Sequence, residues 1–297
     1  SICNLIQKSE NQGQLKTNLT LLINMFKEVY STKANIKDLR DTILQLAIQG
    51  KLVPQDPKDE PASVLLKQIE EEKEQLVKEK KIKKATSLPP ISEEEKPFDL
   101  PKGWKWVRLG RIVHIVRGSS PRPKGLPIYF SQEPTNYNWI TIWDITNKNK
   151  NNVLIGTKEY LTEEGSMKSR HMSLGEIIIA VSGSVGKSCI LGIEGYIYDG
   201  LAGLKYISND TLRDYLSVYL KSWESNLNNM SEGTSWPNIN TDILNSLVIP
   251  LPPKEEQCRI VEKVDEFMAL CDELEKHIEA IVQHSDNLRK AIIKTAN

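Results

Sequence analysis

The sequence predicts an α+β protein, in which one strand-rich mixed domain is flanked by long helices that form coiled coils. Near both ends, apolar residues recur at alternating steps of four and three, a 3.5-residue period typical of coiled-coil helices. Residues 98–250 are instead rich in glycine, proline and aromatic residues, and about 150 residues can bury a core of their own. Their β-like runs are Trp104–Leu109, Trp139–Ile142, Ile177–Val181, Cys189–Leu191 and Leu247–Ile249.

The C-terminal segment, residues 251–297, carries the strongest helix signal. It begins within the sequence Pro250-Leu251-Pro252-Pro253, and only Ser285 interrupts its apolar seam. A helix along this seam is about 50 Å long at a rise of 1.5 Å per residue, and a rod of that length typically holds other parts at a fixed distance. The seam residues are Ile260, Val264, Phe267, Cys271, Leu274, Ile278, Ile281, Leu288 and Ile292.

The N-terminal segment, residues 1–86, is predicted to be a second helical arm. Its first helix is expected to stop at Gly50, before a proline-rich loop, because a proline disfavours helical backbone in the residue before it. A shorter helix follows Pro61, which suits a first helical turn. The charged distal part of this helix, Glu70 to Lys84, is expected to be solvated or frayed. Residues 87–97 form a predicted linker.

The two arms are predicted to pair through their apolar stripes. Leu39–Ala47 resembles Leu288–Ala296, with leucine, arginine, isoleucine and alanine at equivalent offsets. This similarity favours antiparallel or side-by-side packing of similar helices. The predicted helix-interface residues are Leu22, Phe26, Ile43, Ile260, Val264, Phe267, Leu274, Ile278 and Ile281.

Composition and targeting signals narrow the functional classes. The 297-residue chain has 39 Lys and Arg against 39 Asp and Glu, so any surface for an anionic partner must be local. No apolar run approaches the ~20 residues of a membrane span, and no secretory signal stands at the start. The four cysteines lack metal-ligand spacing. We therefore expect a reduced, cytoplasmic protein without a bound metal or a membrane partner.

One candidate binding loop is Ser182-Gly183-Ser184-Val185-Gly186-Lys187-Ser188. It ends like a phosphate-binding P-loop, but that motif requires a glycine where Val181 stands, which disfavours nucleotide hydrolysis. Two interpretations remain: a tight turn between strands, or a small-residue loop that lets a polynucleotide backbone approach. In the second interpretation Ser182, Ser184 and Lys187 contact DNA.

A second candidate is the basic stretch from Lys102 to Lys124. It carries seven lysines and arginines, and the nearest acid before it is Asp99. Arginine can fork onto guanine or clamp phosphates, so Arg117, Arg122 and Lys124, in the turn-rich end of the stretch, are predicted to bind DNA. The alternative is a solvated surface loop.

The third candidate, Ser231–Asn240, combines glycine, hydroxyl and amide side chains with an indole. Amide side chains can pair with adenine edges, so Ser235, Trp236 and Asn238 are predicted to lie near DNA bases or backbone. The alternative is an ordinary capped turn that leads into a helix near Asp242.

Catalytic signatures are absent from the sequence. It contains no G-x-S-x-G, H-E-x-x-H, paired-carboxylate or G-x-G-x-x-G motif, so the chain is predicted to bind rather than catalyse, with no cofactor of its own. The alternative to DNA binding is a coiled-coil scaffold whose globular domain binds protein. Packing of the basic stretch against acids such as Glu159, Glu163 or Glu164 would favour that alternative.

Several segments together resemble the specificity (S) subunit of type I restriction-modification systems. They cover most of the chain: Leu39–Gln55, Glu60–Leu66, Leu100–Trp104, Ser182–Lys187, Ile249–Gln257 and Ile260–Asp265. In that family, each target-recognition domain reads one half of a split DNA sequence, and paired long helices set the spacing between two such domains. The resemblance implies that residues 98–250 are a target-recognition domain and residues 251–297 a spacer helix.

The resemblance also implies partners. In the family, the helices dock methyltransferase (M) subunits, which carry S-adenosylmethionine and methylate adenine, and restriction (R) subunits join further out. A complete S subunit has two recognition domains, whereas this chain has one between two helical arms. As a natural half-subunit, a truncated product or a fragment, it is expected to self-associate. A homodimer would prefer a symmetric, interrupted target.

Overall fold

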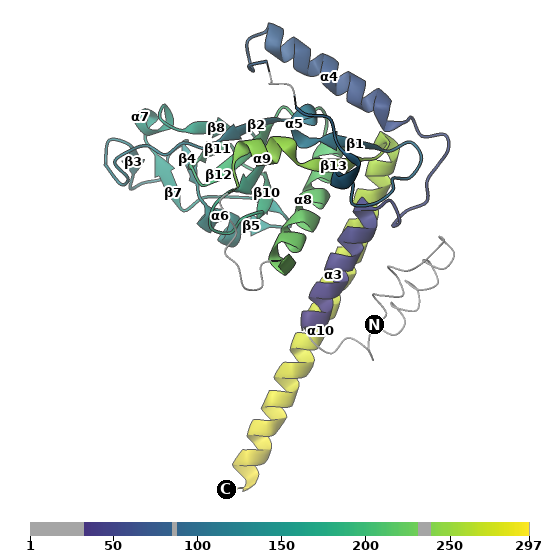
Figure 1. Ribbon diagram of the computed structural model, residues 1–297. Helices are drawn as coiled ribbons and strands as arrows, with labels where there is room; N and C mark the ends of the chain where they lie inside the picture. Colours follow the sequence, from purple (N-terminus) through teal and green to yellow (C-terminus); the bar gives the residue numbers. More distant parts are fainter. Residues whose placement is uncertain (1–32, 85–87, 231–238, 297) are drawn as a thin grey trace. The chain divides into compact units, whose positions relative to one another are not determined.

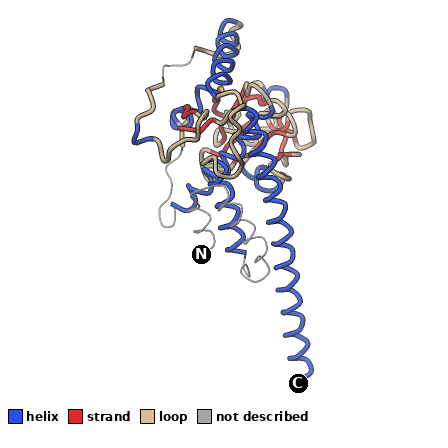
Figure 2. Tube along the Cα trace, turned by 90° about the vertical axis from the view of Figure 1, so that its right-hand side faces the viewer, coloured by secondary structure: helices blue, strands red, loops and turns tan. Residues whose placement is uncertain are grey.

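The computed structural model describes residues 33–84, 88–230 and 239–296, and the chain divides into two compact units. Ser1–Asp56 and Arg259–Asn297 form one, called here the helical unit, and Pro57–Cys258 form the other, the sheet unit. Figures 1 and 2 show long helices in the first and every described strand in the second. The predicted α+β class, a strand-rich domain combined with long helices, is therefore confirmed.

The helical unit contains α3 (Lys33–Ile48) and most of α10 (Lys254–Ala296), which run antiparallel (Figure 1). Arg40 fastens the two helices together, because its guanidinium donates to Asp272 at 2.6 Å and to Glu275 at 3.2 Å. Apolar side chains on both helices are buried: Ile36, Leu39, Ile43, Leu46, Ile260, Val264, Phe267, Cys271 and Ile278.

Two of the predicted interface residues differ from the rest of the α10 seam. Leu274 is half-buried, and Ile281 is 68% exposed. Its neighbour Val282 is also exposed. The seam is therefore covered as far as Ile278 and open at Ile281. The predicted interface residues Leu22 and Phe26 lie outside the described part of the chain.

The C-terminal end of α3 follows the prediction made from Gly50. The amide of Gly50 donates to the carbonyl of Ala47, and that of Lys51 donates to Leu46. This Schellman pattern requires left-handed backbone at the residue after the cap, and Gly50 adopts it with φ 66° at no steric cost. The predicted helix stop is confirmed.

Strands of the sheet unit form three sheets within the described residues. The smallest pairs β1 (Lys105–Arg108) with β13 (Val248–Leu251). A six-stranded sheet has the order β2-β12-β9-β10-β6-β5, and a five-stranded sheet has the order β3-β7-β4-β11-β8. The bounds are His114–Arg117 (β2), Phe130–Ser131 (β3), Asn138–Ile140 (β4), Asn149–Lys150 (β5), Val153–Leu154 (β6), Glu159–Leu161 (β7), Arg170–Met172 (β8), Ile177–Ala180 (β9), Ser188–Leu191 (β10), Gly195–Ile197 (β11) and Leu201–Lys205 (β12).

The main core joins the two larger sheets. It combines Ile140, Met172 and Ile197 from the five-stranded sheet with Leu154, Ile178, Ala180, Cys189, Leu191 and Leu201 from the six-stranded sheet. All four residues of β9 are buried, which explains its unbroken apolar run. The five predicted β-like runs correspond to β1, β4, β9, β10 and β13.

Helices complete the sheet unit. The short ones are α5 (Leu109–Ile112), α6 (Ile142–Asn147), α7 (Glu163–Ser166) and α9 (Thr241–Ser246). The longer α8 (Asp210–Met230) is tied to β13, because the hydroxyl of Tyr215 donates to the Pro250 carbonyl at 2.5 Å and that of Tyr219 to the Val248 carbonyl at 2.9 Å. Burial raises the pKa of both phenols above the ordinary value, so they remain donors.

The second helix of the predicted N-terminal arm, α4 (Ala62–Lys78), belongs to the sheet unit. The ammonium of Lys73 donates to the carbonyls of Gly110 at 2.6 Å and Val113 at 2.9 Å, and Glu70 pairs with Arg111. Burial lowers the pKa of Lys73 to about 8. The single arm expected over residues 1–86 is thus divided at residue 56, because α4 makes its polar contacts with α5 and the residue after it.

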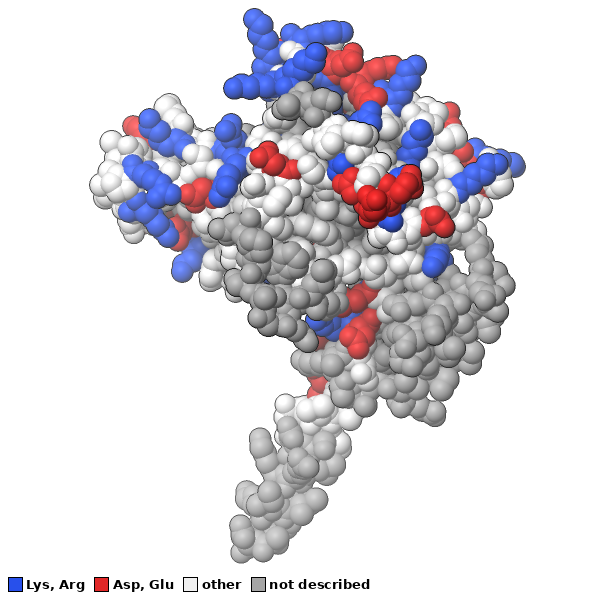
Figure 3. All heavy atoms as spheres, in the orientation of Figure 1, with Lys and Arg blue, Asp and Glu red and all other residues white. Residues whose placement is uncertain are grey.

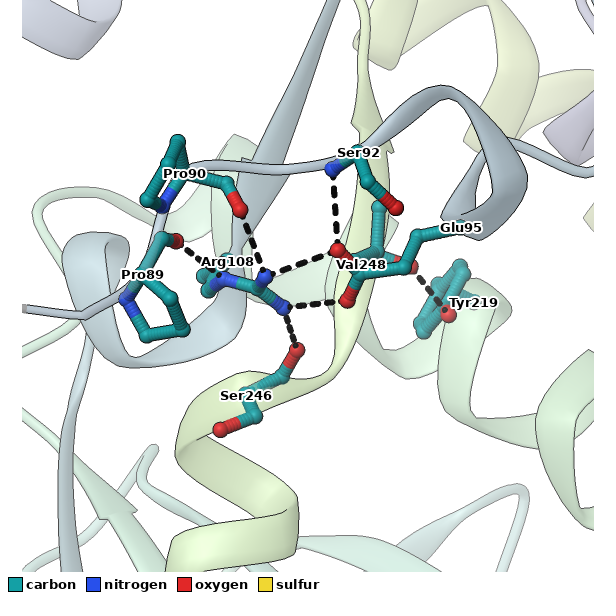
Figure 4. A network of polar contacts seen from close by, with 8 residues as sticks. All are labelled: Pro89, Pro90, Ser92, Glu95, Arg108, Tyr219, Ser246 and Val248. Atoms are coloured by element: carbon teal, nitrogen blue, oxygen red, sulfur yellow. Dashed lines mark hydrogen bonds and ion pairs between the residues drawn. The ribbon is translucent and has the colours of Figure 1, made fainter.

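The linker predicted at residues 87–97 is fixed to the sheet unit by Arg108 (Figure 4). The side chain is 4% exposed, and its guanidinium donates to the carbonyls of Pro89, Pro90 and Ser246 and to both carboxylate oxygens of Glu95 at 2.9 and 3.0 Å. The short 3-10 helix Glu93–Glu95 presents that carboxylate. The described part of the linker is therefore ordered by one arginine.

Candidate nucleic-acid interface

The basic loop, residues 117–124, follows β2 and packs against the connection between β11 and β12. The amide of Gly118 donates to the Leu201 carbonyl, and that of Ser119 donates to Ile197. A Cβ on Gly118 would collide with the Tyr198 backbone, so this close approach requires glycine. The sequence thus fixes the start of the loop while leaving its cations at the surface.

Two predicted DNA contacts in the basic loop, Arg117 and Arg122, meet at Asp199. Arg122 donates to its carboxylate at 2.8 Å, and Arg117 donates to its carbonyl at 3.1 Å. The Arg122 side chain is 78% exposed, and ion pairs of that kind contribute little to stability. Lys124 is also exposed. These cations are therefore free to exchange a weak internal partner for an anionic ligand.

The hairpin turn, residues 182–187, connects β9 to β10. Gly186 donates to the Ala180 carbonyl, and Ala180 donates to Lys187. Gly183 and Gly186 have φ of 70° and 89°, which favours glycine. A P-loop joins a strand to a helix, whereas this segment joins two strands, so it is not a P-loop. Ser184 is exposed at the tip of this tight turn.

A pocket of about 440 Å³ borders both segments. The side chain of Ser182 hydrogen-bonds to Tyr198, and Gly183 lies against Ile142; both Tyr198 and Ile142 line the pocket. Its walls combine rings with charged groups: Phe130, Trp139, Trp143, Tyr198, Arg122, Lys124, Glu159 and Asp199. The structure therefore brings the basic loop and the start of the hairpin turn together beside two accessible rings, Trp143 and Tyr198, of the kind on which bases stack.

Of the predicted DNA contacts that the structure describes, Lys187 is the least available to a ligand. It is half-buried, and its ammonium donates to the Thr146 hydroxyl at 3.3 Å. It also lies near Glu224 of α8, where burial raises the pKa of the carboxyl and the charge of Lys187 opposes that rise. Any DNA contact through Lys187 would compete with these groups.

Only the last two residues of the third candidate loop lie in the described part of the chain. Ser235, Trp236 and Asn238 lie outside the described residues. The next residue, Ile239, donates from its amide to the carbonyl of Val181, which directly precedes the hairpin turn. Asn240 then caps α9 by accepting from the amide of Ile243 at 2.8 Å, as expected for a capped turn leading into a helix near Asp242.

Two further cations, not singled out in the sequence, adjoin the basic loop. Arg170 donates from Nε to the Arg117 carbonyl at 3.4 Å, and the Lys168 carbonyl accepts from Ser119 at 2.9 Å. Both side chains are exposed. Figure 3 shows lysines and arginines gathered over the end of the sheet unit that carries α7, β3 and β8. The run Lys-Ser-Arg-His at 168–171 was the only available sequence signal.

The first half of the basic stretch does not belong to this surface. Arg108 is buried by its contacts to the linker, and Arg111 pairs with Glu70. Neither Glu163 nor Glu164 pairs with the basic loop within the described residues, whereas Glu159 lines the pocket opposite its cations. Packing of the basic stretch against acids would favour a protein scaffold. Such packing involves Arg108 and Arg111, which lie outside the basic loop. Within the loop, the exposed Arg122 pairs with Asp199.

The part of the chain that the structure describes lacks two other kinds of site. None of its helices combines the length and apolar character needed to cross a membrane. It contains no group of three His, Cys, Asp or Glu side chains arranged to hold a metal ion.

Comparison with known proteins identifies the family of the chain. Residues 101–284 match the family model described as type I restriction modification DNA specificity domain. The chain is 35% identical over 293 residues to the type I restriction enzyme EcoAI specificity subunit of Escherichia coli, covering 97% of this chain and 49% of the relative. It is 34% identical to the EcoEI specificity subunit of the same organism, with 97% and 50% covered. The chain thus spans about half the length of these relatives.

Solved structures share the fold. A chain from a study of complex assembly and conformational transition of the type I R-M system aligns with a TM-score of 0.54 at 21% identity, over 95% of this chain and 58% of that one. The HsdS subunit from Thermoanaerobacter tengcongensis aligns with a TM-score of 0.50 at 23% identity, over 81% and 53%. At these identities the similarity supports the architecture alone.

Proposed function

The chain belongs to the type I restriction modification DNA specificity domain family, and we propose that it is the sequence-specific DNA-recognition subunit of a type I restriction-modification complex. The sheet unit reads one half of a split target in double-stranded DNA. The chain binds without catalysing a reaction. Methylation belongs to M subunits, which bring S-adenosylmethionine, and cleavage to R subunits. We infer that the complex is located in the cytoplasm, together with the DNA that it binds.

One observation carries this proposal: exposed cations and aromatic rings converge around the pocket between the basic loop and the hairpin turn. Arg122 and Lys124 line it beside Trp143 and Tyr198. Cations position a protein on phosphates, while base edges and stacking supply sequence information. Lys168 and Arg170 extend the positive surface next to the loop. A scaffold that binds only protein does not require exposed cations beside aromatic rings.

The helical unit is proposed to dock M subunits and to self-associate. Support comes from Ile281 and Val282, which are 68% and 53% exposed on α10 beyond the part of the seam that is covered. The relatives are about twice as long, so a pair of these chains matches the length of one such subunit. A two-fold pair would present identical readers to a symmetric, interrupted site.

The DNA proposal is tested by selecting bound duplexes from a random-sequence pool with the full chain, alone and with M subunits added. We expect a split motif to be enriched. The salt dependence of binding is then measured by fluorescence anisotropy, with Arg122→Ala and Lys187→Ala compared with Lys102→Ala as the control. Each lost phosphate contact reduces the log–log salt slope by about 0.9. A pool that yields no motif under either condition would contradict the proposal.

Self-association is tested by sedimentation of the full chain. We expect a dimer, and Ile281→Asp should shift it to monomer, because a carboxylate would be buried in the apolar pairing surface. Lys276→Gln, an exposed change on the same helix, should leave the dimer intact. A monomeric wild-type chain that also binds no M subunit would refute the docking role of α10.

A further inference from the structure

Two residues of the sheet unit hold backbone conformations that their side chains disfavour. Four non-glycine residues of the described chain have positive φ: Asn151 and Asn152, which tolerate it, together with Lys80 (58°) and Tyr206 (54°). Strained residues of this kind gather at functional sites. We therefore ask what the left-handed backbone of Lys80 and Tyr206 contributes to the molecule.

Lys80 stands where α4 ends, and the end of α3 provides a direct reference. In α4, the amide of Lys80 donates to Val77, and that of Lys81 donates to Leu76. The same pair of bonds closes α3, where glycine fills the left-handed position. The chain uses glycine for this geometry in one helix and keeps a strained lysine in the other.

Tyr206, 37% exposed, lies beside the same helix end. The ammonium of Lys205 lies 5.9 Å from its ring centroid, and the His114 ring lies 6.1 Å away. Lys81 is near enough to interact electrostatically with the phenol. Ile82 is buried at 7% exposure, which anchors the residues around it to the sheet unit. The two strained residues thus belong to one site.

Uncompensated positive charge surrounds this site. Lys78, Lys80, Lys83 and Lys84 are exposed, and none has an ion-pair partner within the described residues, whereas Lys81 pairs with Glu79 at 2.9 Å. Figure 3 shows lysine and arginine side chains gathered over α4, which Figure 1 labels. Like charges held this close repel one another unless an anion neutralises them.

We propose that the α4 lysine cluster, defined as Lys78, Lys80, Lys83 and Lys84 beside Tyr206, is a second DNA-backbone site that grips phosphates outside the recognised sequence. The inference rests on the proposed DNA-binding function. The ligand is the phosphodiester backbone, because mobile ammonium groups bind phosphate as point charges without reading bases. The exposed phenol of Tyr206 supplies a further donor to a phosphate oxygen.

Cations connect this cluster to the basic loop. His114 is influenced by the charges of Lys73, Lys205 and Arg170, and Arg170 bonds to the Arg117 backbone at 3.4 Å. A track from the end of α4 past Tyr206 to the basic loop therefore runs by way of His114 and the exposed Arg170, whereas Lys205 beside it is paired with Glu176 at 3.2 Å. A duplex bound at the basic loop can follow this track with its backbone, since phosphates recur along its whole length.

The experiment measures the salt dependence of DNA binding for the full chain on long and short duplexes that share one selected site. Lys83→Gln with Lys84→Gln should lower the log–log salt slope by about 1.8 for two phosphate contacts on the long duplex, and by less on the short one. The selected sequence should not change. Lys102→Gln with Lys105→Gln, an equal charge change on other exposed residues, should leave the slope unaltered.

Lys80→Gly separates binding from folding. Glycine relieves the left-handed backbone, so the Tm should stay the same or rise, while the salt slope on the long duplex falls by about 0.9. Unchanged slopes in a wild-type chain that binds DNA would overturn the cluster and leave the proposed function standing. Loss of M-subunit binding with DNA binding intact would assign the lysines to a protein partner instead. A wild-type chain without DNA affinity would end both proposals.

Discussion

The two halves of the basic stretch Lys102–Lys124 use the same side chain in opposite ways. All five N–H groups of Arg108 donate inside the sheet unit, to three carbonyls and one carboxylate. Arg122, in contrast, is 78% exposed and has a single carboxylate partner. A buried guanidinium with every donor satisfied cannot exchange them for phosphate. Positive charge in a sequence therefore indicates a binding surface only where the fold leaves its donors unused.

The largest expected effect is on Arg108, whose buried guanidinium stabilises the fold. Arg108→Ala leaves the carbonyls of Pro89, Pro90 and Ser246 without their donor, and we expect the free energy of unfolding to fall by about 3 kcal/mol. All six tryptophans lie in the sheet unit, so urea unfolding followed by their fluorescence measures it. A loss below about 0.5 kcal/mol, the range of ordinary surface changes, would contradict the role assigned to Arg108.

The second prediction is a loss of DNA binding without a loss of stability. Arg122→Ala with Lys124→Ala should leave unfolding within about 0.5 kcal/mol of the wild type, because both side chains are exposed. DNA affinity should fall about tenfold or more, with a salt slope lower by about 1.8. Anisotropy titrations over a range of salt concentrations measure both. A stability loss comparable to that of Arg108→Ala would remove the contrast between the two halves.

The third prediction concerns acid. The hydrogen bonds from Arg108, followed by the amide of Ser92, lower the pKa of Glu95. The folded state therefore favours the carboxylate, and this contribution is complete above the unfolded pKa of about 4.3. It is lost as the pH falls through the lower folded value. Wild-type stability measured from pH 6 to pH 3 should show this decline, and Glu95→Gln should make the profile flatter.

The smallest effect is expected at Arg111, which shares the first half with Arg108 but is 51% exposed. Removing its pair with Glu70 by Arg111→Gln should cost about 0.5 kcal/mol, the usual scale of an exposed ion pair. DNA binding should be unaffected. The same urea and anisotropy measurements apply, and a large loss of affinity would move the boundary of the interface into the first half of the stretch.

Local patterns were enough to predict much of the fold. The 3.5-residue period of α10, the glycine stop of α3 and the apolar run of β9 each arise from neighbouring residues. The membership of α4 in the sheet unit did not, because it depends on Lys73 reaching two carbonyls about forty residues away in sequence. A charged helix with one short apolar face gives no indication of which unit it will pack against.

The candidate site was predicted as separate loops but not as an assembly. Arg122 and Ser182 could be proposed from composition, yet their meeting around Tyr198 depends on the order of strands in two sheets. Arg170 was missed because it becomes a neighbour of Arg117 only when β8 pairs with β11 in one sheet and β2 pairs with β12 in the other. The P-loop resemblance failed for the opposite reason, since a matching tripeptide, Gly186 to Ser188, carries no information about the strand that follows it.

The pairing of β1 with β13 has an evolutionary consequence. Lys105 lies opposite Leu251 and Arg108 opposite Val248, so the chain enters and leaves the strand-rich body at one antiparallel stem. Within the described residues, the segment between 109 and 247 is an insert that begins and ends at that stem, and α4 also contacts it through α5. Recombination between related genes at the two stem strands would exchange the insert as a cassette while preserving both of its junctions. A new binding preference could then be acquired in one step, provided that the new insert keeps its contacts with α4 and β13.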